Sequence, residues 1–238
     1  MGSGLNKLTA CNKAGYRLIT IFEDEWIHRK QIVISQLQTI LGVQTNLKVA
    51  ARTTTIQHIS TTDKSAFLEL NHIQGNGPSS INIGLMHNNQ LVAVMGCFRS
   101  GSDLVLNRYA TNCSVVGGFS KIVSHLIKSY TFDNLISFAD RRWSEAGVYT
   151  KNGFVIDDVL PPDYSYLDTI HRQRLHKFNF RHKYLPKILG DAYNPILTEA
   201  ANMSNAGWHR IYNCGLIRVV LHHPLMQSHN SLCEKSCN

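Results

Sequence analysis

The fold class follows from residues 116–154, VGGFSKIVSHLIKSYTFDNLISFADRRWSEAGVYTKNGF. A glycine pair opens a run whose apolar residues recur at helical spacing, which predicts a helix. The apolar run NLISFAD, residues 134–140, predicts a strand, and SEAGVYTKNGF after it predicts a short helix. The strand ends in a carboxylate beside two arginines and a tryptophan, a set that a connecting loop does not need. This strand end is therefore the first candidate for a functional site.

The residues before this stretch, with a few directly after it, predict two further helices and most of a sheet. The clearest feature is a hairpin over residues 81–99, in which two apolar runs meet at the turn-forming pair Asn88-Asn89. Three acidic residues at 23–25 fall in the first turn of a predicted helix, where the helix dipole favours them. The remaining predicted elements are strand 16–22, helix 23–41, strand 47–59, helix 61–73, strand 104–110 and strand 155–160.

The order of hairpin, strand, glycine turn, helix, strand and short helix resembles the core of the GNAT acyltransferases. In that family a glycine-rich turn at a helix start holds the cofactor's pyrophosphate, and a later helix carries a tyrosine just before an xxGF pattern. The matching pieces here are VGGFSK and VYTKNGF. The resemblance implies an α/β (α+β) fold with a GNAT-like mixed, mostly antiparallel sheet flanked by helices. We expect this core at 46–168, between a junction segment at 1–45 and a basic C-terminal extension at 169–238.

The glycine turn is the predicted cofactor site. Backbone N–H groups at a helix start, unshielded by Cβ at two glycines, bind anions. Ser120 can add a hydroxyl group and Lys121 a positive charge. An ordinary tight turn is the alternative that the residues alone leave open. The resemblance implies acetyl-CoA or a related acyl donor as cofactor, held by Val116, Gly117, Gly118, Phe119, Ser120 and Lys121.

The strand end supplies the predicted catalytic groups. Acyl transfer to a weakly nucleophilic amine needs one group that accepts a proton and another that protonates a leaving atom. Asp140 is the candidate base, or the anchor of the acceptor, and Tyr149 is the candidate general acid. Ser120 and His72 are further catalytic candidates. The alternative is structural: the aspartate caps the following helix and pairs with an arginine next to it, while the tyrosine belongs to the core.

The charge balance favours a polyanionic partner. The formal net charge is +8 at pH 7, from 24 Lys and Arg against 16 Asp and Glu. Residues 171–183, HRQRLHKFNFRHK, hold five Lys or Arg, three His and two Phe without an acid. Such a block can neutralise phosphates while its aromatic rings stack, although a solvated basic face is the alternative. The predicted partner is DNA, contacted by Arg108, Arg141, Arg142, Trp143, Arg172, Arg174, Lys177, Arg181 and Lys183.

Two further resemblances point to phage proteins. Residues 11–26, CNKAGYRLITIFEDEW, with the later SFADRRWS and PPDYSY, resemble the C-terminal region of phage homing endonucleases related to Vsr. SFAD at 137–140, followed by GVY at 147–149, is similar to the phage Mom proteins, which have a GNAT-like fold and alter DNA bases to evade restriction. They imply a phage-type transferase that adds a small acyl-derived group to a DNA base. A non-catalytic DNA-binding or specificity module, and an N-acetyltransferase for a protein or small amine, remain alternatives.

Composition argues against several other classes. No run of about 18 apolar residues is present, so no membrane-spanning helix is expected, and the N-terminus lacks the apolar region of a signal peptide. The six cysteines form no CxxC pair, which argues against a zinc site and favours reduced thiols. We therefore expect a cytoplasmic protein of the phage-infected bacterial cell, with no metal and no membrane partner.

Overall fold

The computed structural model describes residues 3–43 and 47–224, and Cys233 and Cys237 lie outside these ranges. The described chain forms two compact units. Unit 1 contains residues 3–29, 140–143 and 160–216, and unit 2 contains residues 30–139, 144–159 and 217–224 apart from the undescribed 44–46. Each unit has its own apolar core.

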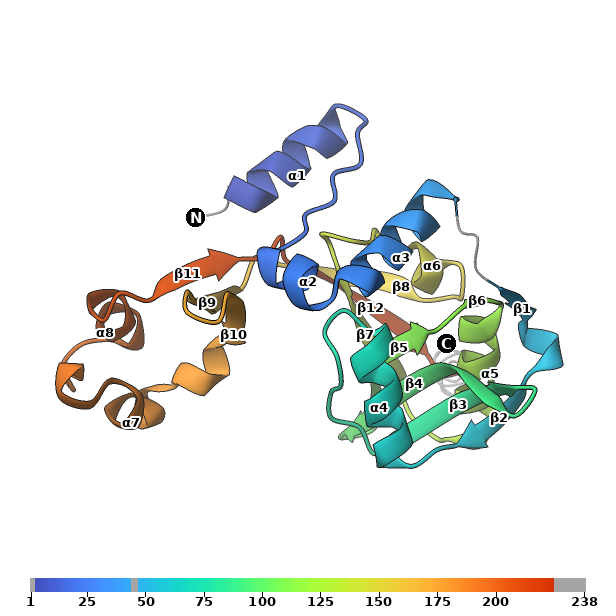
Figure 1. The fold of residues 1–238 in the computed structure, drawn as a ribbon. Coiled ribbons are helices and arrows are strands. Elements are labelled where there is room, and N and C mark those ends of the chain that lie inside the picture. Colours follow the sequence, from blue (N-terminus) through green and yellow to red (C-terminus); the bar gives the residue numbers. More distant parts are fainter. Residues whose placement is uncertain (1–2, 44–46, 225–238) are drawn as a thin grey trace, which may run out of the picture. The chain divides into compact units, whose positions relative to one another are not determined.

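Unit 2 is built on a seven-stranded sheet with the strand order β2-β3-β4-β5-β7-β12-β8 (Figure 1). The first four strands are antiparallel, whereas β5 and β7 are parallel. The predicted mixed, mostly antiparallel sheet flanked by helices is thereby confirmed. The strands are β2 (Thr55–His58), β3 (Ile81–His87), β4 (Gln90–Ser100), β5 (Asp103–Thr111), β7 (Asn134–Asp140), β8 (Val155–Leu160) and β12 (Leu216–His222).

The predicted hairpin is β3 and β4, and its turn explains its sequence. Asn88 and Asn89 both have positive φ, 49° and 61°, a conformation that asparagine tolerates and that matches the twist of a two-residue hairpin. Alternation along β4 then divides the core between two faces of the sheet. Val94 packs with the helix α4 (Thr61–Asn71), whereas its neighbours in the strand pack with α5 (Gly118–Ser129).

The remaining elements of unit 2 flank this sheet. They are the helix α3 (Lys30–Leu41), the parallel pair β1 (Lys48–Ala50) and β6 (Ser114–Val116), the short 3₁₀ helix η1 (Ala51–Thr53), and α6 (Gly147–Thr150). The predicted helix 61–73 and the predicted helix after the glycine pair are thus confirmed, whereas the short helix predicted over residues 144–154 covers only Gly147–Thr150.

Unit 1 is a small three-stranded sheet with the order β10-β9-β11 and several short helices. Its core is formed by Tyr166, Phe180, Leu185 and Met203, which are all buried. Its elements are α1 (Ser3–Lys13), α2 (Glu23–His28), β9 (Tyr164–Asp168), β10 (Gln173–His176), η2 (Lys177–Phe180), η3 (His182–Tyr184), α7 (Leu185–Leu189), η4 (Gly190–Ala192), α8 (Glu199–Asn205) and β11 (His209–Tyr212).

Three predicted elements differ from the structure. Residues 16–22 are irregular instead of a strand, and Phe22 is covered by two guanidinium groups rather than by a neighbouring strand. The predicted helix 23–41 breaks at Arg29, whose φ of −131° is not helical. The predicted strand 47–59 is interrupted by η1, because the Lys121 ammonium group binds the carbonyl oxygen of Ala51 there.

The return of the chain to the main sheet near its end was not predicted from the sequence. Strand β12 lies between β7 and β8, although we expected residues 169–238 to form an extension outside the core. Its apolar run Leu216–His222 lies between the two strands predicted at 134–140 and 155–160, which therefore do not pair with each other. None of the helices within the described ranges has the length and apolarity needed to cross a membrane.

Candidate functional site

The strands β5 and β7 diverge in the middle of the main sheet. They pair at only two positions, Leu104 with Leu135 and Val105 with Ile136. Directly after this point β5 has a bulge, since Leu106 and Arg108 are opposite consecutive residues of β4 and leave Asn107 as the extra residue. A bulge bends its strand and strengthens its twist. The two strands therefore diverge, and backbone groups on their facing edges lose their partners.

Ser137 and Tyr149 lie at this divergence. The Ser137 hydroxyl is 3.0 Å from the carbonyl oxygen of Leu106 and 3.1 Å from the Tyr149 hydroxyl. A carbonyl oxygen can only accept, so the one serine proton goes to Leu106, and Tyr149 donates to the serine oxygen. Burial raises the pKa of Tyr149. The phenol is therefore protonated at neutral pH and held at a fixed position.

The start of helix α5 offers unpaired backbone donors. Gly117 caps this helix with a φ of +78°, a left-handed conformation that glycine adopts readily. The Lys121 amide is bonded to the Gly117 carbonyl, whereas among the described residues no acceptor faces the amides of Gly118, Phe119 or Ser120. Such N–H groups at the positive end of a helix dipole form an anion-binding arrangement.

The side chains around this helix start, predicted to bind the cofactor, make contacts within the protein. A Cβ on Gly118 would lie 2.8 Å from Val115 Cγ1 and 3.0 Å from the Tyr109 hydroxyl, so this glycine makes room for side chains rather than for a phosphate. Lys121 donates hydrogen bonds to the carbonyl oxygens of Ala51 and Thr54. The Ser120 hydroxyl is 2.5 Å from Asn152 Oδ1. The backbone amides are thus the donors that remain for an anion.

A row of aromatic rings joins this helix start to Tyr149. The rings of Tyr109 and Phe119 meet edge to face at 5.2 Å between centroids, and those of Phe119 and Tyr149 at 5.4 Å. Phe154 closes the row at 5.4 Å from Tyr149. Edge-to-face contacts of this kind fix ring positions. The GF pair of the sequence motif thus positions the tyrosine through its phenylalanine.

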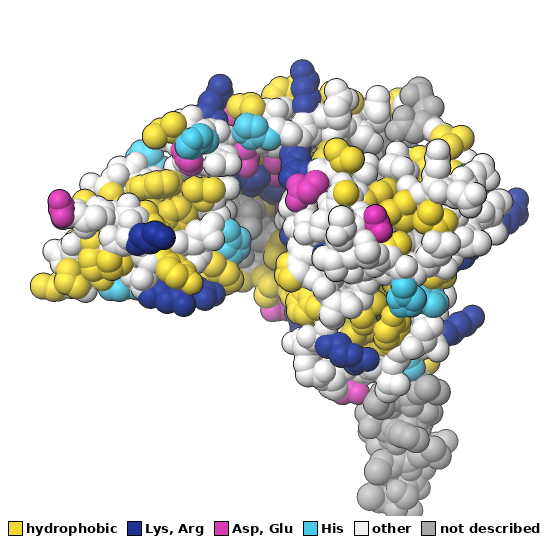
Figure 2. All heavy atoms as spheres, turned by 60° about the horizontal axis from the view of Figure 1, so that its bottom comes forward, with side chains coloured by type: hydrophobic (Ala, Val, Ile, Leu, Met, Phe, Trp, Pro, Cys, Tyr) yellow, Lys and Arg dark blue, Asp and Glu magenta, His cyan; other side chains and the backbone are white. Residues whose placement is uncertain are grey.

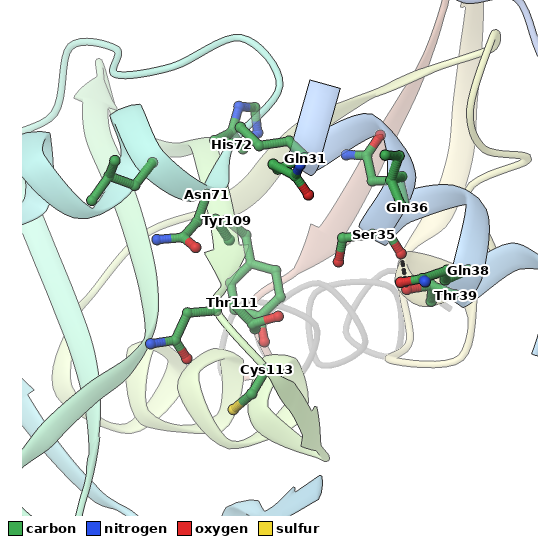
Figure 3. A pocket seen from close by; sticks show the side chains of 15 residues that line it. Gln31, Ser35, Gln36, Gln38, Thr39, Asn71, His72, Tyr109, Thr111 and Cys113 are labelled. Atoms are coloured by element: carbon green, nitrogen blue, oxygen red, sulfur yellow. Dashed lines mark hydrogen bonds between the residues drawn. The ribbon is translucent and has the colours of Figure 1, made fainter. Parts of the chain in front are cut away.

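A pocket of about 500 Å³ lies at the other side of Tyr109, between α3, the end of α4 and the end of β5 (Figure 3). Figure 3 shows Gln31, Ser35 and Gln36 of α3 opposite Asn71 and His72, with Tyr109 between the two groups. None of its described lining residues is Lys, Arg, Asp or Glu. The lining consists of Gln31, Ile32, Ile34, Ser35, Gln36, Gln38, Thr39, Leu70, Asn71, His72, Tyr109, Ala110, Thr111, Asn112 and Cys113.

The polar groups of this pocket suit a neutral, hydrogen-bonding ligand. The Gln36 Oε1 atom is buried and has no hydrogen-bond partner within the described residues. An unpaired buried acceptor costs free energy that a ligand N–H group recovers. The pKa of Tyr109 is raised by burial, so its hydroxyl is a neutral donor as well. Of the catalytic residues predicted from the sequence, His72 is the one that lines this pocket.

Asp140 is held in unit 1 by a buried ion network. Its Oδ2 atom is 2.7 Å from Arg142 Nη2, and the same guanidinium lies 2.9 Å from Glu25 Oε1. Arg174 binds Glu25 and Asp24 at 2.9 and 2.8 Å. Arg142 and Glu25 are only 3% and 4% exposed. Asp140 is thus paired with a neighbouring arginine, which is the structural alternative, and its predicted catalytic role stays a prediction.

The predicted DNA contacts fall into two groups. Several are already engaged: Arg108 with the carbonyl oxygen of Gly75, Arg141 with that of Cys214, Arg172 with Glu23, and Lys177 with Asp163. The second group consists of Arg181 and Lys183, whose side chains have neither a hydrogen-bond partner nor a carboxylate partner among the described residues and lie against aromatic rings. Trp143 is half-buried, and the described residues offer no acceptor to its indole N–H.

Neither the pocket nor the role of Tyr109 was predicted from the sequence. One signal was present: Gln31, Ser35 and Gln38 recur at spacings of four and three, so polar groups share one face of a predicted helix. Nothing in the sequence showed that this face would lie opposite Asn71 and Tyr109. Within the described ranges, no three His, Cys, Asp or Glu side chains are grouped closely enough to hold a metal ion.

Comparison with known proteins gives fold similarity alone. No protein-family model matches the chain, and no curated protein is significantly similar in sequence. Similar solved structures include the ribosomal-protein-S18-alanine N-acetyltransferase of Escherichia coli, with 15% identity, a TM-score of 0.42, and coverage of 71% of this chain and 94% of that one. A Bacillus subtilis acetyltransferase in complex with CoA has 14% identity, a TM-score of 0.40, and coverage of 71% and 98%. A GNAT family acetyltransferase from Elizabethkingia anophelis with acetyl-CoA bound has 14% identity, a TM-score of 0.38 and the same coverage.

Proposed function

We propose that the chain is an acyltransferase of GNAT-like fold that modifies a base in DNA. One observation carries the proposal: Tyr109 lines the polar pocket, and its hydroxyl lies beside Gly118 at the start of α5. An anion-binding helix start and a pocket for a neutral polar group therefore share one wall. A transferase needs this pairing, because it must hold an anionic donor and an acceptor side by side.

The donor fits at the start of α5 and the divergence of β5 and β7. The unpaired amides of Gly118, Phe119 and Ser120 would bind its pyrophosphate, and the absence of a side chain at Gly117 leaves them accessible. A CoA thioester would supply the activated acyl group. The Tyr149 phenol is protonated at neutral pH, and burial, which raises its pKa, keeps it so at higher pH. It holds a proton at the divergence that could be given to a leaving sulfur atom.

The acceptor fits the pocket between α3 and α4. Asparagine and glutamine side chains recognise base edges because each amide offers a donor and an acceptor together. The pocket presents such amides from Gln31, Gln36 and Asn71 without a formal charge. A base would have to leave the duplex to enter it. The similarity of SFAD and GVY to the Mom proteins supports the choice of DNA over other amines.

An assay with labelled acetyl-CoA tests this proposal and separates its alternatives. Transfer is measured to DNA, to a protein mixture and to small polyamines, with the wild type and with Tyr149→Phe. We expect label in DNA, reduced about 10²–10⁴-fold by the loss of one hydroxyl. Label in protein or polyamines alone would favour the amine acetyltransferase. No label in any acceptor, with DNA still bound, would favour the binding module.

The pocket is tested separately through its unpaired acceptor. Gln36→Met should raise the KM for the acceptor while leaving donor binding unchanged, because its amide contacts neither Tyr149 nor α5. Gln57→Met is the matched control, since Gln57 is exposed on β2. Equal KM values for the two variants would remove this pocket from the proposal.

A further inference from the structure

The basic block of the sequence is divided in two by the fold. Residues 171–187 carry six Lys or Arg and no acid, yet the first three of these cations have carboxylate partners. Arg172 pairs with Glu23, Arg174 with Asp24 and Glu25, and Lys177 with Asp163 at 2.6 Å. The carboxylates of α2 lie 149 or 150 residues away in the sequence, and Asp163 lies 14 residues before Lys177, outside the block. The block therefore looks uncompensated only when it is read as a linear stretch. Its first half stabilises unit 1.

The second half forms a surface in which cations lie against aromatic rings. The Arg181 guanidinium is 4.4 Å from the centre of the Phe178 ring, and the Lys183 ammonium is 4.8 Å from that of Tyr184. Arg210 of β11 lies 5.1 Å from the ring of Tyr164. We call this set the cation–aromatic row; it consists of Tyr164, Phe178, Arg181, Lys183, Tyr184 and Arg210.

A shared contact joins two of the three pairs in the row. The Lys177 ammonium lies 5.3 Å from the Tyr164 ring and 5.8 Å from the Phe178 ring, so it joins the β11 side to η2. Tyr184 then follows within η3. Figure 2 shows Lys and Arg side chains gathered with apolar ones on the part of the molecule that contains α7 in Figure 1.

Two of the three rings of the row are exposed and lie outside the core, whereas Tyr164 is half-buried and packs against it. Phe178 is 53% and Tyr184 is 43% exposed, and neither belongs to the core of unit 1. Arg181, Lys183 and Arg210 are exposed and have no carboxylate partner among the described residues. Exposed rings combined with free cations match single-stranded nucleic acid, whose bases stack on rings while its phosphates meet cations. Duplex DNA hides its base faces, and the five-residue α7 is too short for an amphipathic membrane helix.

We propose that the cation–aromatic row of unit 1 binds single-stranded nucleic acid. The inference deepens the proposed function, because an enzyme that acts on an extracted base gains from holding an unpaired strand. It does not depend on the reaction, since the row lies in unit 1 and the donor site in unit 2. Binding can therefore be measured without any acyl donor.

The test is fluorescence anisotropy with a labelled single-stranded DNA oligonucleotide at several salt concentrations. The charge variant is Arg181→Gln, Lys183→Gln and Arg210→Gln together, and its matched control removes three exposed charges elsewhere, with Lys13→Gln, Arg52→Gln and Lys128→Gln. We expect the row variant to lower the slope of log K against log salt by about 2, from three lost phosphate contacts on a single strand. The control should change the slope by much less.

Stacking is tested with Phe178→Leu and Tyr184→Leu, which keep an apolar side chain at positions that do not belong to the core of unit 1. Each should weaken binding to the single strand by roughly tenfold and leave the melting temperature unchanged. Tyr149→Phe should bind as the wild type does, so a failed reaction and a failed surface are distinguishable. Three results would each overturn the proposal. The first is an equal loss of binding in the row variants and the control variant. The others are tighter binding to a duplex of the same sequence and binding to vesicles of anionic lipid in place of DNA.

Discussion

Arg142 shows how a residue that looks functional in a sequence can be structural in the fold. Its guanidinium lies between Asp140 and Glu25 at 2.7 and 2.9 Å and stacks 4.3 Å above the centre of the Phe22 ring. Asp140 also accepts a hydrogen bond from the Arg142 amide at 2.9 Å. The carboxylate and the arginines of the SFADRRW motif thus join three separate segments of unit 1.

We predict that Arg142→Gln lowers the free energy of unfolding by about 3–5 kcal/mol, because it leaves the Asp140 carboxylate without its cation and the buried Glu25 carboxylate with Arg174 alone. The matched control is Arg172→Gln, whose ion pair with Glu23 is exposed and should be worth about 0–1 kcal/mol. Denaturant unfolding of the two variants measures both values. Equal stability would show that the buried network does not hold unit 1 together.

Helix α5 is the element on which the proposed donor site depends. Its first turn carries unpaired amides, and its apolar face packs Phe119, Ile122, Val123 and Leu126 into the core. The amides are therefore fixed in position before any ligand arrives. This rigidity favours binding, since no ordering of the loop opposes it.

A charge placed at this helix start should separate donor binding from folding. We predict that Ser120→Glu abolishes measurable binding of CoA in calorimetry, because a carboxylate occupies the region of the free amides. The same carboxylate suits the helix dipole, so the melting temperature should stay equal or rise. Ser129→Glu, at the other end of the helix, is the control and should bind CoA normally with a slightly lower melting temperature. Unchanged CoA binding by Ser120→Glu would place the donor elsewhere.

At the scale of the whole molecule, the sequence predicted the parts that depend on local patterns. The hairpin, the glycine turn and strand 134–140 follow from alternation and turn residues, and they appear where expected. The division of the basic block could not be predicted, because Glu23 and Asp163 reach it only through the fold. The pocket was missed for the same reason, since α3 and β5 supply its walls from distant segments.

The main core also contains a buried thiol, that of Cys97, which should lower the free energy of unfolding at alkaline pH. Burial raises the pKa of the Cys97 thiol to about 12, from an ordinary 9.0. Below pH 9 the thiol is protonated in both states, whereas between about 9 and 12 only the unfolded chain loses the proton. The free energy of unfolding should therefore fall with rising pH, by about 1.4 kcal/mol per pH unit for this group. Urea unfolding of Cys97→Ala should show a slope shallower by that amount, and an unchanged slope would contradict the buried thiol.

The most direct test of the account is mass spectrometry of nucleosides from the DNA of cells that express the protein. Wild type and Tyr149→Phe are compared with Tyr16→Phe, a control that changes a tyrosine 72% exposed in unit 1. We predict a nucleoside that carries an added acyl-derived mass with the wild type and the control, and at least about 10²-fold less of it with Tyr149→Phe at equal amounts of folded protein. DNA with only its ordinary nucleosides in cells that hold folded wild-type protein, or equal modification by Tyr149→Phe, would contradict the account.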